Sequence, residues 1–322
     1  MSQVYLPQLH MAPMAGITDR VTRQIVRSCG ADVVYSEMVS SRGIFYKDKK
    51  THTLMSFDPC ERPIHLQIFG NDPETMAYAA RVCAEYQPDW ININMGCPMT
   101  KIAGNGDGGA LMKDPMLAAR ICEAVASATD IPLSVKFRSG WDHESINAPE
   151  FARILVQSGA KELTIHARTV KQQYSGFADL RVAQAVVEAV DVPVIISGDI
   201  RDWDSAVAAI QTGAAGLMLG RATLGDPWLF RRLKDIAQGR EPEPIDTDRR
   251  LAAALLHAKR LCALKGERTG MCESRKFSGW YIKGFSDAAV LRDSVCRVTA
   301  YSQLEELLRR YMTRDVKEED VF

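Results

Sequence analysis

The chain lacks the features that would tie it to a membrane, a metal ion or an oxidising compartment. No apolar run approaches the roughly 18 uninterrupted residues of a membrane helix, and the first residues lack a basic region followed by an apolar one. Its eight cysteines include no CxxC pair and no short Cys/His spacing of the kind that binds zinc. We therefore expect a soluble, cytoplasmic protein with free thiols, no metal and no membrane contact.

An excess charge of either sign is also missing, because 40 basic residues balance 40 acidic ones in a chain of 322. Net charge therefore gives no argument for binding to nucleic acid or to membranes. The charge is uneven along the chain, however, since residues 249–297 contain eleven basic and four acidic side chains, a net of +7. Such a cluster is either a solvated helix surface or a site for an anionic partner such as RNA.

Short apolar runs recur along the first two thirds of the chain, and each is followed by a helical pattern such as that of residues 115–128. This alternation is typical of βα units. It predicts a closed (β/α)8 TIM barrel of parallel strands, with a doubly wound open sheet as the alternative. The predicted strands are Leu9–Met14, Val33–Glu37, Ile64–Ile68, Trp90–Met95, Leu133–Arg138, Leu163–His166, Val194–Ser197 and Gly216–Leu219.

The alternation stops after Trp228, and two prolines within residues 241–244 indicate a linker because proline resists helix formation. Only helical patterns follow. We therefore predict a catalytic barrel domain over residues 1–241 and a smaller all-helical domain over residues 242–322. The charged segment Arg314–Asp320 is expected to fray.

Polar or special residues stand at the carboxyl ends of nearly all the predicted strands, and these ends meet on one face of a parallel barrel. Cys97 follows one such strand, on a turn that Gly96 and Pro98 indicate. Most free cysteines are small buried hydrophobic residues. A cysteine on a turn at this face is nevertheless placed to give or take a proton, so Cys97 is the candidate catalytic residue.

Two glycine turns, at residues 197–199 and 220–221, follow the last two predicted strands. Glycine lets backbone N–H groups approach a phosphate and the adjacent arginine adds charge, although the same glycines would also make ordinary tight turns. Lys136 lies near the end of the fifth predicted strand, where its charge is placed to stabilise negative charge on a reduced flavin ring, although such a residue alone is more often a satisfied structural one. His166 and Gln67 are placed to hydrogen-bond the same ring.

A glycine-rich run matches the pattern GxGxxG at Gly104, Gly106 and Gly109. A dinucleotide-binding turn must follow its strand directly, and this run begins about nine residues later, so we reject that interpretation. A mobile loop that carries Cys97 explains the glycines better. The sequence gives no role for Asp107, which lies within the same run.

A series of short motifs connects these candidates. They are APMAGITD at residues 12–19, NINMGCP at 92–98, VKFR at 135–138, IHAR at 165–168, SGD at 197–199 and GR at 220–221. In this order they resemble the signature segments of bacterial tRNA-dihydrouridine synthases, most closely the B-type members. Residues 274–281 resemble the family's basic helical motif. The chain departs from the commoner pattern at Ser197, where asparagine is frequent, and at Phe277, where histidine is frequent.

The resemblance implies an FMN-containing barrel and a tRNA-binding helical domain, which together reduce selected uridines in tRNA with NADPH. Cys97 would be the catalytic acid. From their positions, Asn94 is expected to hold the edge of the uracil, Arg138 the base or its phosphate, and Arg275 and Lys276, in the basic segment, the RNA. We expect a monomer with no other protein partner. The residues expected to contact FMN are Pro13, Met14, Ala15, Gln67, Lys136, His166, Ser197, Gly198, Asp199, Gly220 and Arg221.

The chemistry of uracil reduction is consistent with these residues. It requires a hydride at C6, which is conjugated to the C4 carbonyl, and a proton at C5, where charge develops. A reduced flavin supplies the first, and an acid on the opposite face supplies the second. A thiol with a pKa of about 8.5 is mostly protonated at neutral pH and suits that role. The base must also leave the folded tRNA, at a cost of a few kcal/mol that a basic helical domain would offset.

Three other functions remain open. A flavoenzyme of the free-pyrimidine or dihydroorotate type would share the barrel and sometimes the cysteine, but its task requires no basic helical domain. A sugar-phosphate isomerase would explain the glycine turns and leave Cys97 unused. A non-catalytic RNA-binding protein would need neither feature. A flavin absorption spectrum would exclude the last two.

Overall fold

The computed structural model describes residues 5–285 and 287–322. Within these ranges no helix is both long enough and apolar enough to cross a membrane. Contacts between Cα atoms divide the chain into two compact units, a barrel unit and a helical unit.

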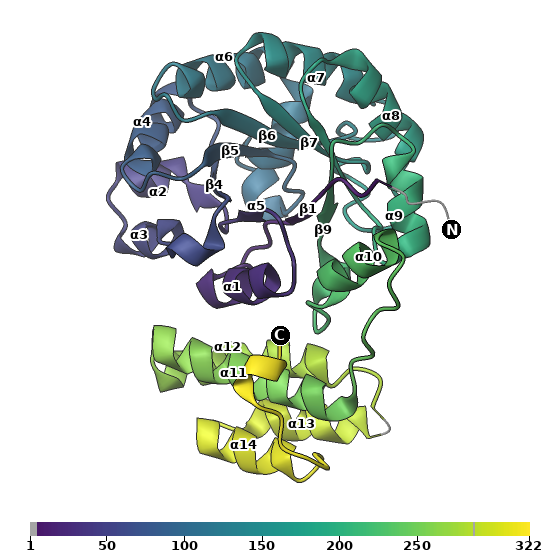
Figure 1. Cartoon of the computed structure of the whole chain (residues 1–322). Helices are drawn as coiled ribbons and strands as arrows, with labels where there is room; N and C mark the ends of the chain where they lie inside the picture. Colours follow the sequence, from purple (N-terminus) through teal and green to yellow (C-terminus); the bar gives the residue numbers. More distant parts are fainter. Residues whose placement is uncertain (1–4, 286) are drawn as a thin grey trace. The chain divides into compact units, whose positions relative to one another are not determined.

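The barrel unit, residues 5–20 and 31–220, is built around a ring of parallel strands (Figure 1). The strands are β1 (Gln8–Met11), β2 (Val34–Tyr35), β3 (Val39–Ser40), β4 (Ile64–Phe69), β5 (Trp90–Met95), β6 (Leu133–Arg138), β7 (Glu162–His166), β8 (Val194–Ser197) and β9 (Gly216–Leu219). They pair in the order β1-β9-β8-β7-β6-β5-β4-β2, with β3 paired to β4, and a parallel bridge between His10 and Val33 joins the two ends. This ring confirms the predicted (β/α)8 class and excludes the open sheet.

Helices cover the outside of the ring (Figure 1). They are α2 (Ser41–Phe45), α3 (Lys49–Met55), α4 (Pro73–Ala84), α6 (Pro115–Ala126), α7 (Ala148–Gln157), α8 (Leu180–Ala189) and α9 (Trp203–Ile210), with the 3-10 helix η1 (Pro59–Glu61). The short helix α5 (Thr100–Ala103) and the 3-10 helix η2 (Gly108–Lys113) belong instead to the segment between β5 and α6. The carboxylates of Asp72 and Asp114 accept the N–H groups of Thr75 and Leu117, each at 2.9 Å, and a proline follows each aspartate. An acceptor before a proline is a strong helix start, so these sequences fix where α4 and α6 begin.

Two predicted strands are shorter than expected. The segment Val33–Glu37 gives only the short β2, because the Ser36 side chain accepts the N–H of Gln67 at 2.9 Å and interrupts the pairing. The strand predicted over Leu9–Met14 stops at residue 11. There the Met14 carbonyl accepts the N–H groups of residues 17 and 18, each at 3.0 Å, and closes a turn.

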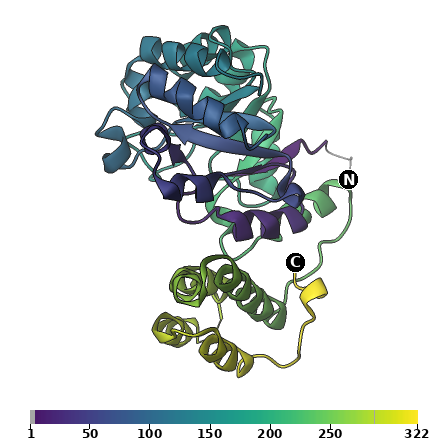
Figure 2. The same ribbon diagram turned by 90° about the vertical axis from the view of Figure 1, so that its left-hand side faces the viewer.

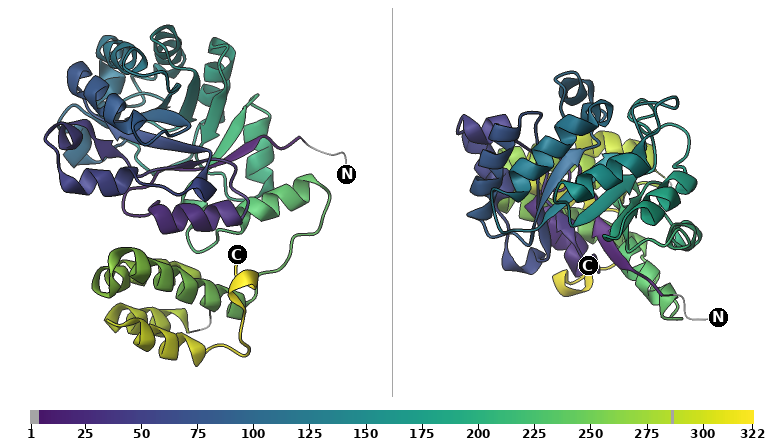
Figure 3. Two further views of the ribbon diagram at one scale, coloured as in Figure 1. Left: turned by 60° about the vertical axis from the view of Figure 1, so that its left-hand side comes forward. Right: turned by 90° about the horizontal axis from the view of Figure 1, so that it is seen from above.

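The helical unit comprises residues 21–30 and 221–322. Its elements are α1 (Arg20–Ser28), η3 (Arg221–Thr223), α10 (Leu229–Ala237), α11 (Thr247–Lys265), α12 (Glu267–Tyr281), α13 (Ala288–Arg297), α14 (Tyr301–Arg309) and η4 (Glu318–Asp320). The helices α11 and α12 are antiparallel, and α13 and α14 lie against them (Figures 2 and 3). Because α1 and α10 group with this unit, its limits differ from the predicted domain boundary after residue 241, which stays a prediction.

The approach of α12 to α11 depends on Gly270. A Cβ atom at this position would lie 2.5 Å from the Cα of Cys262, which is closer than real Cβ atoms come to any neighbour. Alanine at residue 270 would therefore push the two helices apart.

The prediction that the charged end of the chain frays is wrong. Val321 is 1% exposed, and its carbonyl accepts the indole N–H of Trp228 at 3.0 Å and the Nε–H of Arg249 at 3.1 Å. Arg314 also forms an ion pair with Asp246 at 2.6 Å. The buried Val321, directly after the charged segment Arg314–Asp320, thus anchors this segment, although its composition alone predicted fraying.

Candidate functional site at the carboxyl ends of the barrel strands

Strand register brings five of the predicted residues to one edge of the barrel. Asn94 pairs with Lys136, Arg138 pairs with His166, and His166 pairs with Ser197. All of them lie at or near the carboxyl ends of parallel strands, where barrel proteins hold their ligands. Residues that are far apart in the sequence therefore share one site.

Buried amide side chains connect three strands beneath this edge. Gln67 donates to the Oδ1 of Asn92 at 2.7 Å and accepts from the Nδ2 of Asn94 at 3.0 Å. Asn92 in turn donates to the hydroxyl of Ser134 at 2.8 Å. An amide group offers two donors and an acceptor with two lone pairs, so Gln67 keeps one N–H for a ligand while its orientation is fixed.

The turn that carries Cys97 is held from both sides. The Oδ1 of Asn94 accepts the N–H of Gly96 at 3.1 Å and that of Cys97 at 2.9 Å. From the neighbouring strand, the Nε–H of Arg138 donates to the Gly96 carbonyl at 2.8 Å. Asn94 and Arg138, predicted to bind substrate, therefore also fix the backbone of the candidate acid.

Burial raises the pKa of the Cys97 thiol above its ordinary value. A hydrogen bond from the backbone of Met99 and the positive charges of Arg138 and Lys136 oppose this shift without cancelling it. The thiol is therefore protonated at neutral pH, and it suits a proton donor better than a nucleophile, which requires the thiolate.

The glycine-rich run packs directly on Cys97. The N–H of Gly109 donates to the Cys97 carbonyl at 3.0 Å, and a Cβ atom on Gly109 would lie 2.9 Å from that oxygen. A Cβ atom on Gly108 would lie 3.1 Å from the Cβ of Cys97. Close approach to the thiol turn thus explains these glycines, and the predicted mobility of the loop stays a prediction.

Asp107, in the same run, is buried, and burial raises its pKa while the charge of Arg42 opposes the shift. Its Oδ1 has no hydrogen-bond partner among the residues that the structure describes. We have no physical account of this side chain.

Lys136 presents a cation without a partner. Its ammonium forms no hydrogen bond or ion pair with any residue of the ranges 5–285 and 287–322. Burial and the nearby charge of Arg138 lower its pKa to about 7. An anionic or electron-rich ligand beside Lys136 would reverse the shift, since an opposite charge favours the ammonium form.

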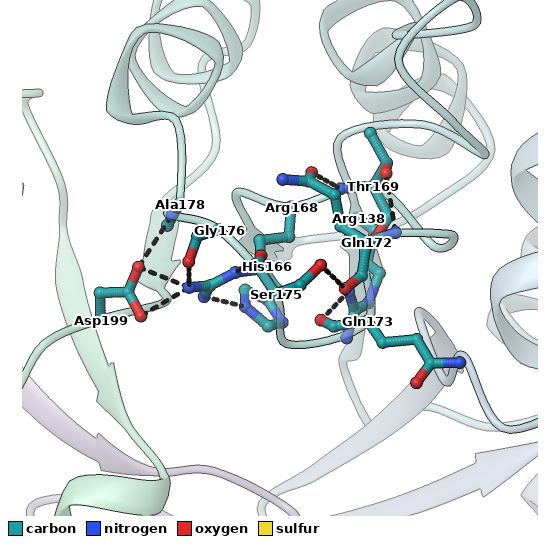
Figure 4. Close-up of polar contacts among 10 residues, drawn as sticks. All are labelled: Arg138, His166, Arg168, Thr169, Gln172, Gln173, Ser175, Gly176, Ala178 and Asp199. Atoms are coloured by element: carbon teal, nitrogen blue, oxygen red, sulfur yellow. Dashed lines mark hydrogen bonds and ion pairs between the residues drawn. The ribbon is translucent and has the colours of Figure 1, made fainter.

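An ion pair between the buried Arg168 and the half-buried Asp199 connects the ends of the next two strands (Figure 4). The Nη2 of Arg168 donates to both carboxylate oxygens of Asp199, at 2.8 and 2.7 Å, and its Nη1 lies 3.3 Å from the Nε2 of His166. Gly198 lies against the same imidazole, because a Cβ atom there would be 3.0 Å from the Cδ2 of His166. The Asp199 side chain is therefore occupied by Arg168, and the predicted contact of Asp199 with FMN would have to use its backbone.

The glycine turn after β9 adjoins the turn after β1. A Cβ atom on Gly220 would lie 3.9 Å from the sulfur of Met14, so the two predicted cofactor contacts are neighbours. Pro13 is half-buried and Ala15 is exposed on the same turn. Arg221 begins η3 and belongs to the helical unit, so its predicted contact with the cofactor phosphate stays a prediction.

The two predicted RNA contacts in α12 differ in their surroundings. Arg275 uses its guanidinium within the helical unit, where Nε and Nη2 donate to the Val298 carbonyl at 3.2 and 2.9 Å. Lys276 is half-buried, with its ammonium 5.0 Å from the ring centre of Phe277. Phe277 itself is buried against His257, with ring centres 4.2 Å apart, so it is a packing residue of this unit.

Sequence reasoning missed three residues that hold the site together: Asn92, Ser134 and Arg168. A signal was present for Asn92, which lies two positions from Asn94 within β5. Side chains two positions apart in a strand point to the same face. Two polar residues that are two positions apart in an otherwise apolar strand are therefore expected to share a face and to contact the same neighbours.

The fold and the site define a class of protein. It is a TIM barrel whose carboxyl ends combine a protonated thiol, an unpartnered ammonium and glycine turns. This combination suits an enzyme that binds a small anionic ligand and transfers a proton.

The chain belongs to the dihydrouridine synthase family, since residues 10–317 match the family described as "Dihydrouridine synthase (Dus)". It is 37% identical over 300 residues to "Probable tRNA-dihydrouridine synthase 1" of Synechocystis sp., covering 92% of this chain and 84% of that protein. It is 37% identical over 287 residues to "tRNA-dihydrouridine synthase B" of Pseudomonas aeruginosa, covering 88% and 86%. It is 36% identical over 308 residues to "Probable tRNA-dihydrouridine synthase" of Rickettsia conorii, covering 94% and 92%. The family predicted from the motifs is thereby confirmed.

Proposed function

We propose that this protein reduces the C5–C6 double bond of specific uridines in tRNA, with FMN as cofactor and NADPH as reductant. The observation that carries the proposal is the protonated thiol of Cys97, held on its turn at the same barrel edge as the unpartnered ammonium of Lys136. Its relatives bear the name tRNA-dihydrouridine synthase, which supports the same substrate.

FMN, when bound, supplies the hydride for C6 of uracil. The protein must then deliver a proton to C5 from the opposite face, and Cys97 has the chemistry for this step because its raised pKa keeps the proton on sulfur. Asn94 keeps Cys97 in place, because its Oδ1 accepts the N–H groups of the turn while its Nδ2 donates to Gln67, and Arg138 holds the same turn.

The residues at the barrel edge fit FMN. The Lys136 ammonium needs an electron-rich neighbour, Gln67 keeps a free N–H, and the imidazole of His166 lies one strand further on. We assign Lys136, Gln67 and His166 to the flavin ring and residues 197–199 and 220–221 to its phosphate.

A stopped-flow experiment tests the proposal as a whole. The purified protein should show flavin absorption, lose it with NADPH and regain it when unmodified tRNA is added in the absence of oxygen. Dihydrouridine should appear in the tRNA by mass spectrometry. A folded protein that takes up no FMN, or a reduced flavin that tRNA does not reoxidise, would contradict the proposal.

Replacing Lys136 with alanine is expected to weaken FMN binding by about tenfold or more, the usual value of a hydrogen bond to a charged group. Arg221→Ala is also expected to weaken FMN binding, because it removes a positive charge assigned to the FMN phosphate. The measurement is titration of the flavin-free protein with FMN. Lys161→Ala is the matched control, because this exposed lysine precedes β7 at the opposite edge of the barrel. Equal affinities in all four proteins would remove both residues from the cofactor site.

Reversing the charge of Lys276 is expected to raise the Kd for tRNA and to flatten its dependence on salt, because each phosphate contact releases counterions. The slope of log Kd against log salt should fall by roughly one for one lost contact. Arg275→Glu should weaken binding too, but it also removes the bonds to the Val298 carbonyl and should lower the melting temperature. If the plots of log Kd against log salt concentration superimpose for wild type and Lys276→Glu, Lys276 does not contact RNA.

A further inference from the structure

A loop beside the proposed active site is fixed by two buried arginines, Arg138 and Arg168, each 2% exposed (Figure 4). The loop, residues 169–178, joins β7 to α8. The Nη1 of Arg138 donates to the carbonyls of Thr169 and Gln173, at 2.8 and 2.7 Å. A charged donor that binds backbone carbonyls fixes the path of the chain and leaves the loop's own side chains free to vary.

Arg168 holds the second half of the loop. It donates to the carbonyl of Ser175 at 3.1 Å and to that of Gly176 at 2.8 Å. Where the loop ends, the N–H of Ala178 donates to the carboxylate of Asp199 at 2.8 Å. The loop therefore has a defined shape, set by these bonds and by those that Thr169, Gln172 and Ser175 make within it, and not by Tyr174 or Phe177.

This fixed loop presents two aromatic rings to solvent, since Tyr174 is 51% exposed and Phe177 is 80% exposed. Gln173, just before the tyrosine, has φ 52°, a left-handed conformation that a residue with a side chain rarely adopts. The Tyr174 ring centre lies 6.4 Å from that of His166 and 5.7 Å from the Cζ of Arg138. Tyr174 therefore borders the proposed site while much of its surface remains open.

We propose that Tyr174 and Phe177 form a stacking surface for the nucleobases that flank the target uridine, an inference that rests on the proposed function. When a base leaves the stack to enter an active site, its neighbours lose a stacking partner. Aromatic side chains replace that partner for any base, because every base has a π-face. A rigid loop strengthens such contacts, since little freedom is lost on binding.

The small size of the surface argues for bases over a protein partner. A stable protein interface buries about 800 Å² on each side. Two side chains of one loop offer a small part of that area, but each matches the face of a nucleobase. The neighbouring guanidinium of Arg138 adds a positive charge that suits RNA and disfavours an apolar peptide.

Removing the ring tests the proposal on the complete FMN-loaded protein. Tyr174→Leu and Phe177→Leu keep an apolar side chain but remove the π-face, and Tyr174→Phe keeps the ring. Tyr5→Leu is the control, because Tyr5 is 81% exposed and precedes β1 at the other edge of the barrel. We expect the Kd of unmodified tRNA to rise about tenfold in each loop leucine variant, within the range for one lost base stack. Tyr174→Phe should restore wild-type affinity to within about twofold.

Flavin reduction by NADPH, measured in the same proteins, locates the effect. We expect kcat/KM for tRNA to fall at least tenfold more than the rate of this half-reaction in Tyr174→Leu. Equal losses in both would place Tyr174 at the cofactor and overturn the inference, as would wild-type tRNA affinity in both leucine variants or an equal loss in Tyr5→Leu. If wild-type protein itself does not reduce tRNA, the proposed function fails instead, and the two failures are distinct.

Discussion

Replacing Cys97 with alanine is expected to slow reoxidation of the reduced flavin by tRNA by about 10²-fold or more, the usual effect of losing a general acid. Reduction of the flavin by NADPH needs no proton at C5 of uracil, so this half-reaction should keep most of its rate. The measurement is stopped-flow absorbance of each half-reaction in the absence of oxygen. Cys60→Ala, which removes an exposed thiol, is the matched control.

The protonation state of Cys97 adds a second test with a definite sign. Burial raises the pKa of this thiol, so the fraction that carries a proton stays near one through neutral pH and falls only above the raised pKa. The tRNA half-reaction should therefore be flat across neutral pH and decline only at alkaline pH. A decline that begins near pH 7 would mean that a group other than Cys97 controls the rate, such as Lys136 with its pKa of about 7. Equal loss of both half-reactions in Cys97→Ala would make Cys97 a structural residue.

The structure explains why the thiol needs support. Two backbone N–H groups of its turn bond to Asn94, and Arg138 binds the carbonyl of Gly96. These bonds fix where the sulfur can lie relative to a bound base. Since general acid catalysis depends on reach within hydrogen-bond distance, Asn94→Ala should lower the rate of the same half-reaction even though Cys97 remains.

The central strands were predictable because their composition agrees with their environment. Residues 90–95, 133–138 and 194–197 are the observed bounds of β5, β6 and β8. β5 and β6 alternate apolar with polar residues and β8 is an apolar run that ends at Ser197, patterns that both predict strands. The early end of β2 within the predicted strand 33–37 was not predictable. It depends on the hydroxyl of Ser36, which accepts the N–H of Gln67 in place of a backbone carbonyl.

Side-chain partners in the site were harder to foresee than positions. Lys136, His166 and Ser197 could be placed at one edge from strand ends alone. The engagement of Asp199 by Arg168 depends on a left-handed turn at residues 198 and 199, with φ of 118° and 56°. A sequence does not specify which of several nearby charges will pair when the pairing is set by such a turn.

A second titratable cluster lies inside the barrel, away from the proposed chemistry. Glu162 is 7% exposed, and the hydroxyl of Tyr35 lies 3.5 Å from its Oε1 and 3.2 Å from the Nδ1 of His10. His65 stacks on Trp90 with ring centres 5.4 Å apart. Burial raises the pKa of Glu162 to about 7 and lowers that of His10 to about 4, because a buried group resists charge.

The two shifts act on stability with opposite signs. The pKa of Glu162 rises from 4.5 to about 7, so between these values the folded state holds a proton that the unfolded state has lost, and stability falls as pH rises. The pKa of His10 drops from 6.5 to about 4, so between these values the unfolded state holds the extra proton and stability rises with pH. The two slopes largely cancel at mildly acidic pH, and the cost of ionising Glu162 appears in full near pH 8.

Replacing Glu162 with glutamine is therefore expected to stabilise the protein near pH 8. One pKa unit corresponds to about 1.4 kcal/mol, so the rise of the pKa from 4.5 to about 7 gives a gain of roughly 3 kcal/mol in the free energy of unfolding. The gain should shrink toward zero as the pH falls to 4.5, where the carboxyl of Glu162 takes up its proton in the unfolded state too. In the variant, without the opposing effect of Glu162, stability should rise with pH between about 4 and 6.5 because of His10. Melting temperatures between pH 4.5 and 8.5 measure this difference, with Glu150→Gln on the exposed surface of α7 as the control. If the difference in melting temperature between Glu162→Gln and wild type does not change with pH, Glu162 is already ionised in the folded barrel at neutral pH. Its partner would then have to be a cation rather than the hydroxyl of Tyr35.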